Sequence, residues 1–369
     1  MSHDTKELIF YDTPHDLVYF CDRLTSNSTR LYRAHCIITK ILGGWSAYLL
    51  PLICGLGLTM HTAVIAIIFT NLKCMPRQLI YTGCLSCSNV ITNILFAWLW
   101  LFPAKGLPFA TKGRIYYFIS NASRLACRLF RFNYSLSTTF TSNLILCSAI
   151  DRCLSIFYPV SFSRWKKRHA WYVCLIVFVV SGIMMLPFLI IIDWIQIGRF
   201  HICWLDESEF HLQVYHTIFA NLGLVQSTLI VIVNVAFITR LRIQFKKTGG
   251  GGLAYNKKEL KHITISIILL AFSMSYVLTA LPQTTVYLLA FLWSHSRVDT
   301  TAENEVSVRM MYNLADIGWN IHFLRELVDL FMYFVYLKPL RRALILKIKQ
   351  YIKTITHYDS NSSEPSMAR

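Results

Sequence analysis

The chain has 369 residues, of which 55% are hydrophobic and only 15% are charged, and its formal net charge is +17. Soluble domains carry about a quarter charged residues, so this composition excludes a soluble enzyme and indicates a protein that crosses a membrane several times. The positive charge is divided among short segments between apolar stretches, which argues against nucleic-acid binding and is typical of cytoplasmic loops in a lipid bilayer protein.

The N-terminal segment, residues 1–44, mixes acidic and basic residues and contains Cys21 and Cys36. The sequence leaves open whether these two cysteines form a bridge. Asn27 begins a glycosylation sequon, which can be used only if this end of the chain is extracellular. A second sequon begins at Asn121, close to a predicted membrane span.

Seven apolar stretches lie within residues 45–336, and each is long enough to cross about 30 Å of hydrocarbon as a helix. We place them at 45–70, 79–103, 124–151, 170–192, 212–240, 262–292 and 309–336. The predicted fold is therefore an all-α membrane protein, a seven-transmembrane helix bundle. Residues 337–369 are predicted to form an amphipathic eighth helix on the inner membrane surface and a polar cytoplasmic tail.

The distribution of charge predicts the orientation of these spans. Lysines and arginines follow spans one, three, five and seven, whereas the segment after span four contains Asp193, Asp206, Glu207 and Glu209. The positive-inside rule therefore predicts an extracellular N-terminus and a cytoplasmic C-terminus. The segment after span two is an exception, because it is external by parity and yet contains Lys105, Lys112 and Arg114.

Three motifs occur at defined places in these spans. The third span ends with Asp151-Arg152-Cys153, the sixth contains Pro282, and the seventh contains Asp329-Leu330-Phe331-Met332-Tyr333. In order and spacing they resemble motifs of the rhodopsin-like (class A) G protein-coupled receptors, over almost the whole chain. Because the motifs are substituted, the chain resembles a divergent member, similar in character to invertebrate peptide receptors.

The resemblance implies a plasma-membrane receptor that binds an extracellular ligand, expected to be a neuropeptide, and activates a heterotrimeric G protein. Asp151, Arg152 and Tyr333 would form the G protein switch, with Arg152 paired to Asp151 at rest. Pro282 would bend the sixth helix and act as its hinge. Cys127 and Cys203 would form the disulfide between the third helix and the second external loop. No cofactor and no enzymatic activity are implied.

The ligand is expected to bind between the outer halves of helices three, five, six and seven. Seven side chains lie at suitable depth, namely Arg128, Arg131, Tyr134, Gln283, Tyr287, Trp319 and His322. Arg131 would contact a carboxylate or carbonyl group, and Trp319 would provide a stacking face. Alternatively, Arg128 and Arg131 reach lipid headgroups or the acidic residues 206–209.

A polar site is predicted in the middle of the bundle, formed by Asn89, Thr141 and Asp329. The Asp329 carboxylate could hold a sodium ion, with Thr141 as a hydroxyl ligand. It could equally pair with Arg325 one helical turn away or hydrogen-bond to Asn89. No other metal site is predicted.

Two other classes of protein remain open. In a membrane transporter or channel, Arg325, Glu326 and Asp329 would be intramembrane charges on a permeation route. The substituted motifs would also fit a receptor-like protein that no longer activates a G protein.

Overall fold

The computed structural model describes residues 21, 30–70, 77–163, 165–197, 200–205, 210–247, 257–296, 302–335, 341 and 345. Its elements are α2 (Arg30–Gly44), the π-helical η2 (Trp45–Leu49), α3 (Leu50–Thr70), α4 (Gln78–Thr92), the π-helical η3 (Asn93–Gly106), α5 (Leu107–Ala110), the 3-10 turn η4 (Ile119–Asn121), α6 (Arg124–Phe157), α7 (Pro159–Ser163), α8 (Lys167–Met185), α9 (Phe188–Ile191), β1 (Ile192–Ile197), β2 (Phe200–Leu205), α10 (Phe210–Lys247), α11 (Lys257–Ser296), α12 (Ala302–Phe323) and α13 (Arg325–Val335). The predicted eighth helix lies outside the described residues, apart from Arg341 and Ile345.

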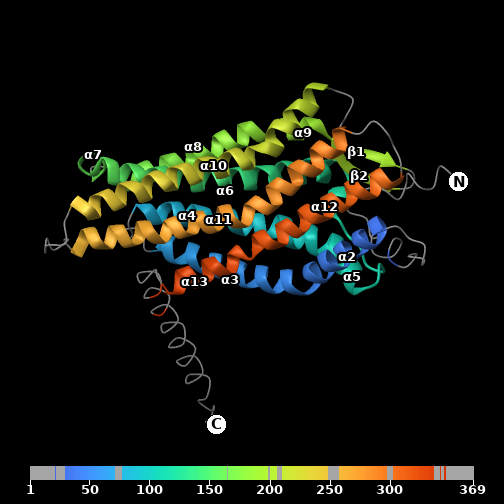
Figure 1. Cartoon of the computed structure of the whole chain (residues 1–369), viewed down its shortest axis with the longest axis horizontal. Coiled ribbons are helices and arrows are strands. Elements are labelled where there is room, and N and C mark those ends of the chain that lie inside the picture. Colours follow the sequence, from blue (N-terminus) through green and yellow to red (C-terminus); the bar gives the residue numbers. More distant parts are fainter. Residues whose placement is uncertain are drawn as a thin grey trace, which may run out of the picture.

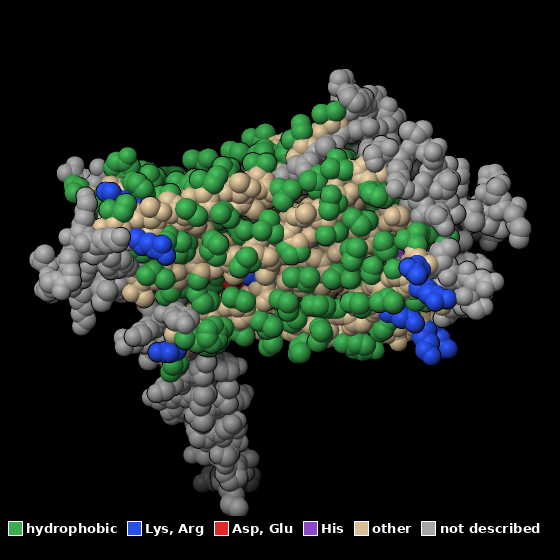
Figure 2. All heavy atoms as spheres, viewed as in Figure 1, with side chains coloured by type: hydrophobic (Ala, Val, Ile, Leu, Met, Phe, Trp, Pro, Cys, Tyr) green, Lys and Arg blue, Asp and Glu red, His purple; other side chains and the backbone are tan. Residues whose placement is uncertain are grey.

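The long helices run side by side along the molecule and form one bundle (Figure 1). The β-hairpin and α2 lie at one end of it, and α7 lies at the other. Hydrophobic side chains dominate the middle of the surface, while lysines and arginines gather towards the two ends (Figure 2). Large apolar side chains such as Leu52, Leu175 and Leu278 are more than half exposed, as expected where lipid covers the protein. The predicted seven-helix membrane bundle is thereby confirmed.

Within the described residues, six helical stretches are long and apolar enough to cross a membrane. The first of them runs without interruption from Arg30 to Thr70, so the helix begins before the predicted membrane span at residue 45. Residues 30–44 were missed because their apolar positions lie on one face only. That face buries His35, Cys36, Thr39, Leu42 and Gly43, at the spacing of one side of a helix. The full run of 41 residues is about 60 Å long and extends beyond the hydrocarbon layer.

The seventh span is divided at Leu324 into α12 and α13 and begins at Ala302, earlier than the predicted 309. Five of its charged residues are buried, namely Arg309, Asp316, Arg325, Glu326 and Asp329. Because of these charges, the seventh span is not one of the six stretches that are apolar enough to cross a membrane.

A buried polar cluster fixes α2 against α12. Asn313 Nδ2 lies 3.3 Å from Thr39 Oγ1 and 3.4 Å from His35 Nε2. Lys105 Nζ donates to Asn313 Oδ1 at 3.3 Å and lies 3.6 Å from Asp316 Oδ2. These contacts give a structural role to Lys105, one of the basic residues that follow span two. Next to this cluster, Cys36 is joined to Cys21 by a disulfide.

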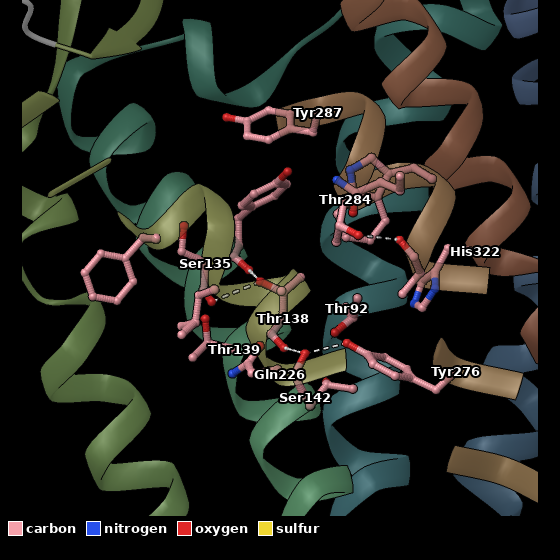
Figure 3. Close-up of a pocket in the computed structure, with 18 of the residues that line it drawn as sticks. Thr92, Ser135, Thr138, Thr139, Ser142, Gln226, Tyr276, Thr284, Tyr287 and His322 are labelled. Atoms are coloured by element: carbon pink, nitrogen blue, oxygen red, sulfur yellow. Dashed lines mark hydrogen bonds between the residues drawn. The ribbon is translucent and has the colours of Figure 1, made fainter. Parts of the chain in front are cut away.

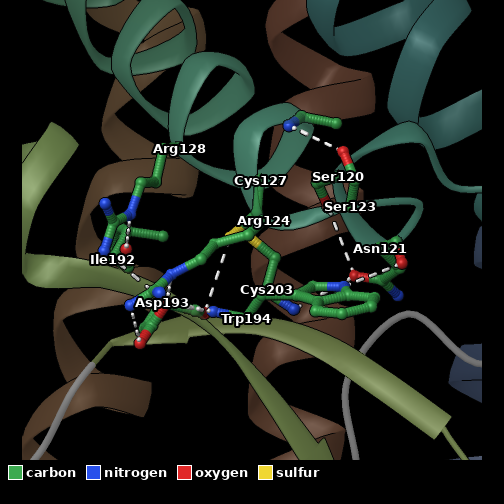
Figure 4. The surroundings of a disulfide bond; sticks show 11 residues. Ser120, Asn121, Ser123, Arg124, Cys127, Arg128, Ile192, Asp193, Trp194 and Cys203 are labelled. Carbon is green, nitrogen blue, oxygen red and sulfur yellow. Dashed lines mark hydrogen bonds and ion pairs between the residues drawn. A yellow bond between two sulfur atoms is a disulfide. The ribbon is translucent and has the colours of Figure 1, made fainter.

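The segment after span four forms an antiparallel hairpin of β1 and β2, which the sequence did not predict. Trp194 pairs with Cys203 in its register, and a disulfide links Cys203 to Cys127 in the first turns of α6 (Figure 4). Ser123 caps this helix by accepting a hydrogen bond from the Ala126 backbone N–H at 3.1 Å, as N-cap residues do.

Asn121 also anchors the hairpin. Its Oδ1 accepts from the Cys203 backbone N–H at 3.2 Å, and its carbonyl oxygen accepts from Trp194 Nε1 at 2.9 Å. Its Nδ2 donates to the Tyr116 hydroxyl at 3.4 Å. These bonds hold the amide to which a glycan would be attached against the hairpin, and the glycosylation of Asn121 stays a prediction. Asn27 lies outside the described residues.

Asp193 fixes the hairpin to α6 by ion pairs (Figure 4). Arg124 donates to its two carboxylate oxygens at 2.7 and 2.9 Å, and Arg128 Nη2 lies 3.7 Å from Oδ1. Burial opposes ionisation of Asp193, but the Trp194 backbone N–H and the two guanidinium groups outweigh it. The pKa of Asp193 therefore lies below its usual value.

We expect Cys203→Ser to lower the free energy of unfolding by about 4 kcal/mol, since the Cys127–Cys203 bond closes a loop with a sequence separation of 76 residues. Thermal unfolding in detergent measures the effect. Cys153→Ser, at an unbonded cysteine of the same helix, is the matched control and should change stability far less. Equal effects of the two substitutions would contradict the structural role of the bond.

The stabilisation by Asp193 should depend on pH. Because the folded-state pKa is depressed, the contribution is complete above the unfolded value of about 4 and disappears as the pH falls through the folded value. We expect Asp193→Asn to have a lower melting temperature than the wild type at pH 7, with the difference closing below about pH 4. A difference that stays constant from pH 7 to 3 would contradict this.

Candidate functional site

A cavity of about 180 Å³ opens between α6, α9, α10, α11 and α12, near the hairpin end of the bundle. Six of the seven predicted ligand residues line it, namely Arg131, Tyr134, Gln283, Tyr287, Trp319 and His322. Arg128 does not line it: its Nε donates to the Ile192 carbonyl oxygen at 3.2 Å, and its guanidinium faces Asp193. The hairpin engages the Arg128 side chain, and its role in ligand binding stays a prediction.

Arg131 is the charged group best placed to meet a ligand. Among the described residues, none forms an ion pair with its guanidinium, and its buried Nε atom has no hydrogen-bond partner. The guanidinium carbon lies 5.9 Å from the centroid of the Tyr134 ring. The cavity therefore presents a cation that no described residue compensates, which favours ligands with an anionic or strongly accepting group.

Tyr134 and Trp319 belong to an aromatic cluster on one side of the cavity. Phe96 stacks on Tyr134 with a centroid separation of 4.0 Å and lies 4.1 Å from the Trp319 ring. Trp319 is only 8% exposed. The two rings therefore pack the bundle as well as line the cavity, and only part of each faces a ligand.

The structure adds hydroxyl groups that sequence reasoning overlooked. Figure 3 shows side chains from α6, α10 and α11 turned towards the cavity, with Ser142 hydrogen-bonded to Tyr276. Gln226 donates to Asn143 Oδ1 at 2.7 Å. Besides Thr141, which the sequence analysis named, four residues of α6 contribute hydroxyls: Ser135, Thr138, Thr139 and Ser142. Their recurrence at helical spacing was the signal that could have found them.

The predicted mid-membrane site holds four ionisable side chains, all buried: His61, Arg325, Glu326 and Asp329. Arg325 Nη2 donates to Asn89 Oδ1 at 2.7 Å, and its Nε lies 3.4 Å from Asp329 Oδ2. His61 Nε2 lies 2.8 Å from Glu326 Oε2. Asp329 was predicted either to hold a sodium ion or to pair with a neighbouring side chain. In the structure it forms an ion pair with Arg325.

A sodium ion does not fit this site. The Arg325 guanidinium already lies between Asn89 and Asp329, so a second cation would meet strong repulsion. Thr141, the predicted hydroxyl ligand, donates to the Ser137 carbonyl oxygen at 2.8 Å and bonds to Ser88 at 2.6 Å. Among the described residues, no group of three or more His, Cys, Asp or Glu could hold a metal ion.

The inner end of α6 departs from the predicted switch. Asp151 pairs with Arg77 at 3.2 Å and accepts from the Tyr81 hydroxyl at 3.4 Å. Arg152 donates instead to Ser273 Oγ at 3.1 Å and to the Ser148 carbonyl oxygen at 3.1 Å. The predicted Asp151–Arg152 pair is therefore wrong, because neighbouring residues on a helix point in different directions.

Arg152 thus links α6 to α11, and Asn234 of α10 joins the same serine at 3.0 Å. Tyr333 is buried against Phe272, with 4.9 Å between ring centroids. Both Arg152 and Tyr333 line a second cavity of about 20 Å³, large enough for one water molecule. Arg152 Nη1 and Asp329 Oδ1, within the described part of the chain, have no hydrogen-bond partner.

Pro282 lies inside α11, which continues as a helix on both sides of it.

Comparison with known proteins identifies the family. The family model described as 7 transmembrane receptor (rhodopsin family) matches residues 60–316, well over half of the chain. The protein therefore belongs to the rhodopsin family of seven-transmembrane receptors and is a G protein-coupled receptor by family.

The chain is similar to G-protein coupled receptor 183-A of Danio rerio, with 24% identity over 151 residues. The matched part covers 40% of this chain and 38% of the relative, so it spans well under half of either protein.

Gly57 of α3 tests the His61–Glu326 pair. A Cβ atom at this position would lie 2.8 Å from Glu326 Cδ and would displace the carboxylate from His61. We expect Gly57→Ala to lower the free energy of unfolding by about 1–3 kcal/mol.

Gly55→Ala is the matched control on the same helix, because a Cβ there has no atom within 4 Å. It should be neutral or slightly stabilising, since alanine favours helix. Thermal unfolding in detergent compares the two variants, and equal effects would contradict the close approach of Gly57 to Glu326.

Proposed function

We propose that the protein is a plasma-membrane receptor that binds an extracellular peptide in the 180 Å³ cavity and activates a heterotrimeric G protein. The observation that carries the proposal is the Arg131 guanidinium, which lines the cavity and has no ion-pair partner among the described residues. A C-terminal carboxylate, an acidic side chain or an amide carbonyl of a peptide would supply the missing acceptor.

The proposed orientation has the hairpin end outside the cell. The disulfides Cys21–Cys36 and Cys127–Cys203 belong to that end, and disulfides persist in oxidising compartments. The cavity lies towards the same end, with Ile192 of the hairpin in its wall. We therefore assign residues before Arg30 to an extracellular segment and residues 337–369 to the cytoplasm.

Activation is proposed to begin with the contacts of Arg152. Its bond to Ser273 ties the inner half of α6 to α11, and Asn234 ties α10 to the same point. Outward movement of α11 about Pro282 would break these bonds and expose Arg152 to a G protein. The Arg77–Asp151 pair does not involve α11 and would survive the movement.

A transporter or channel is less well supported. Each of the intramembrane charges Arg325, Glu326 and Asp329 contacts a partner side chain. Charges committed to each other in this way hold helices together and do not line an open route.

The proposal is tested in cells that express the full chain together with reporters for several G protein classes. A panel of amidated peptides and peptides with free C-terminal carboxylates is applied, with surface expression measured in parallel. A ligand-evoked signal is expected. Ion or solute flux without ligand, and no nucleotide exchange on any G protein, would contradict the proposal.

For an activating peptide, we expect Arg131→Gln to lower potency about tenfold or more, because a charge-assisted hydrogen bond contributes about 1.5–3 kcal/mol. Arg128→Gln is the matched control, since Arg128 lies one helical turn away and contacts the hairpin. It should change potency less than about threefold. Equal losses in the two variants would show that Arg131 does not contact the peptide.

A further inference from the structure

We propose that Arg325 is a fixed internal cation that takes the place of a mobile cation at the centre of the bundle. The wild-type protein should therefore neither bind Na⁺ at Asp329 nor be stabilised by it. This inference depends only on the buried cluster and not on the proposed ligand or G protein.

The surroundings of Arg325 are those that a cation requires. Its guanidinium contacts Asn89 Oδ1 of α4 at 2.7 Å and lies 3.4 Å from Asp329 Oδ2 of α13. Its Cζ atom also lies 5.2 Å from the centroid of the Tyr276 ring on α11. Two oxygen atoms and an aromatic face therefore surround one positive charge. All four residues are buried.

The second carboxylate of the cluster is also committed. Glu326 Oε2 lies 2.8 Å from His61 Nε2, and His61 lies within 3.4 Å of Ser86 Oγ and 3.3 Å of Asn89 Nδ2. Through these pairs and Asn89, the cluster joins two carboxylates, one guanidinium and an imidazole. A further cation at Asp329 would lie next to the Arg325 guanidinium, which would repel it.

Arg325 also separates the two cavities of the bundle. It lines both the outer cavity of about 180 Å³ and the inner one of about 20 Å³, and Asp329 lines only the inner one. Replacing Arg325 by a shorter uncharged side chain would therefore free the Asp329 carboxylate and connect it to the outer cavity. A small hydrated cation could then reach the Asp329 carboxylate from the outer cavity and would be attracted by its uncompensated charge.

The test compares the melting temperature of the purified full chain in NaCl, KCl and choline chloride at equal ionic strength, without ligand. For the wild type, Na⁺ and K⁺ should give the same value within about 1 °C. For Arg325→Met, Na⁺ should raise the melting temperature by about 2 °C or more over K⁺, because a site that binds only the folded protein stabilises it.

Three variants serve as controls. Arg325→Lys keeps a cation and should remain indifferent to Na⁺. The double variant Arg325→Met with Asp329→Asn removes the carboxylate and should lose the Na⁺ effect. Arg309→Met removes a buried arginine of α12, leaves Asp329 paired and should show no Na⁺ effect.

A Na⁺-specific rise in the wild type would overturn the inference, and so would a folded Arg325→Met protein without any Na⁺ effect. If Arg325→Met does not fold, Arg325→Gln carries the same test, since its amide can still donate to Asn89. The absence of a ligand response in cells would contradict only the proposed function.

Discussion

The structure depends on one group of buried charges, Arg325, Glu326 and Asp329, which are paired with each other and with side chains of neighbouring helices. Removing an ion from water costs several kcal/mol even after relaxation, so an unpaired carboxylate or guanidinium would destabilise the bundle. Arg325, Glu326 and Asp329 lie on α13, while their partners His61 and Asn89 come from α3 and α4. The cluster therefore holds three helices in one arrangement, because another arrangement of α3, α4 and α13 would separate these charges from their partners.

The same cluster lies between the parts that a receptor must connect. Arg325 borders the outer cavity, where Arg131 faces the space a ligand would fill, and the inner cavity, where Arg152 lies. Arg152 in turn holds α6 to α11 through Ser273. A ligand that shifts α11 would disturb contacts at both cavities, because Tyr276 on this helix lies over the Arg325 guanidinium. Coupling between the two ends can thus pass through side chains that are already in contact.

Much of the fold followed from hydropathy, since a helix in lipid must be apolar over its length wherever it faces lipid. The same signal missed residues 30–44, where only one face is apolar, and it could not predict the hairpin of β1 and β2. Six of the seven predicted ligand residues line the cavity, because the resemblance to rhodopsin-like receptors indicated their depth in the helices. The partners of the buried charges were harder to predict. Asp151 pairs with Arg77, which is 74 residues away in sequence, and the Arg152–Ser273 contact spans 121 residues. Such pairs depend on how the helices pack, which one sequence does not specify.

An experimental structure of the ligand-free full chain in NaCl, at a resolution that shows side chains and ions, examines the buried cluster directly. The guanidinium of Arg325 should lie between Asn89 and Asp329, with His61 against Glu326. An ion or water molecules between Asn89 and Asp329, with Arg325 turned away from both, would contradict the proposed arrangement of charges.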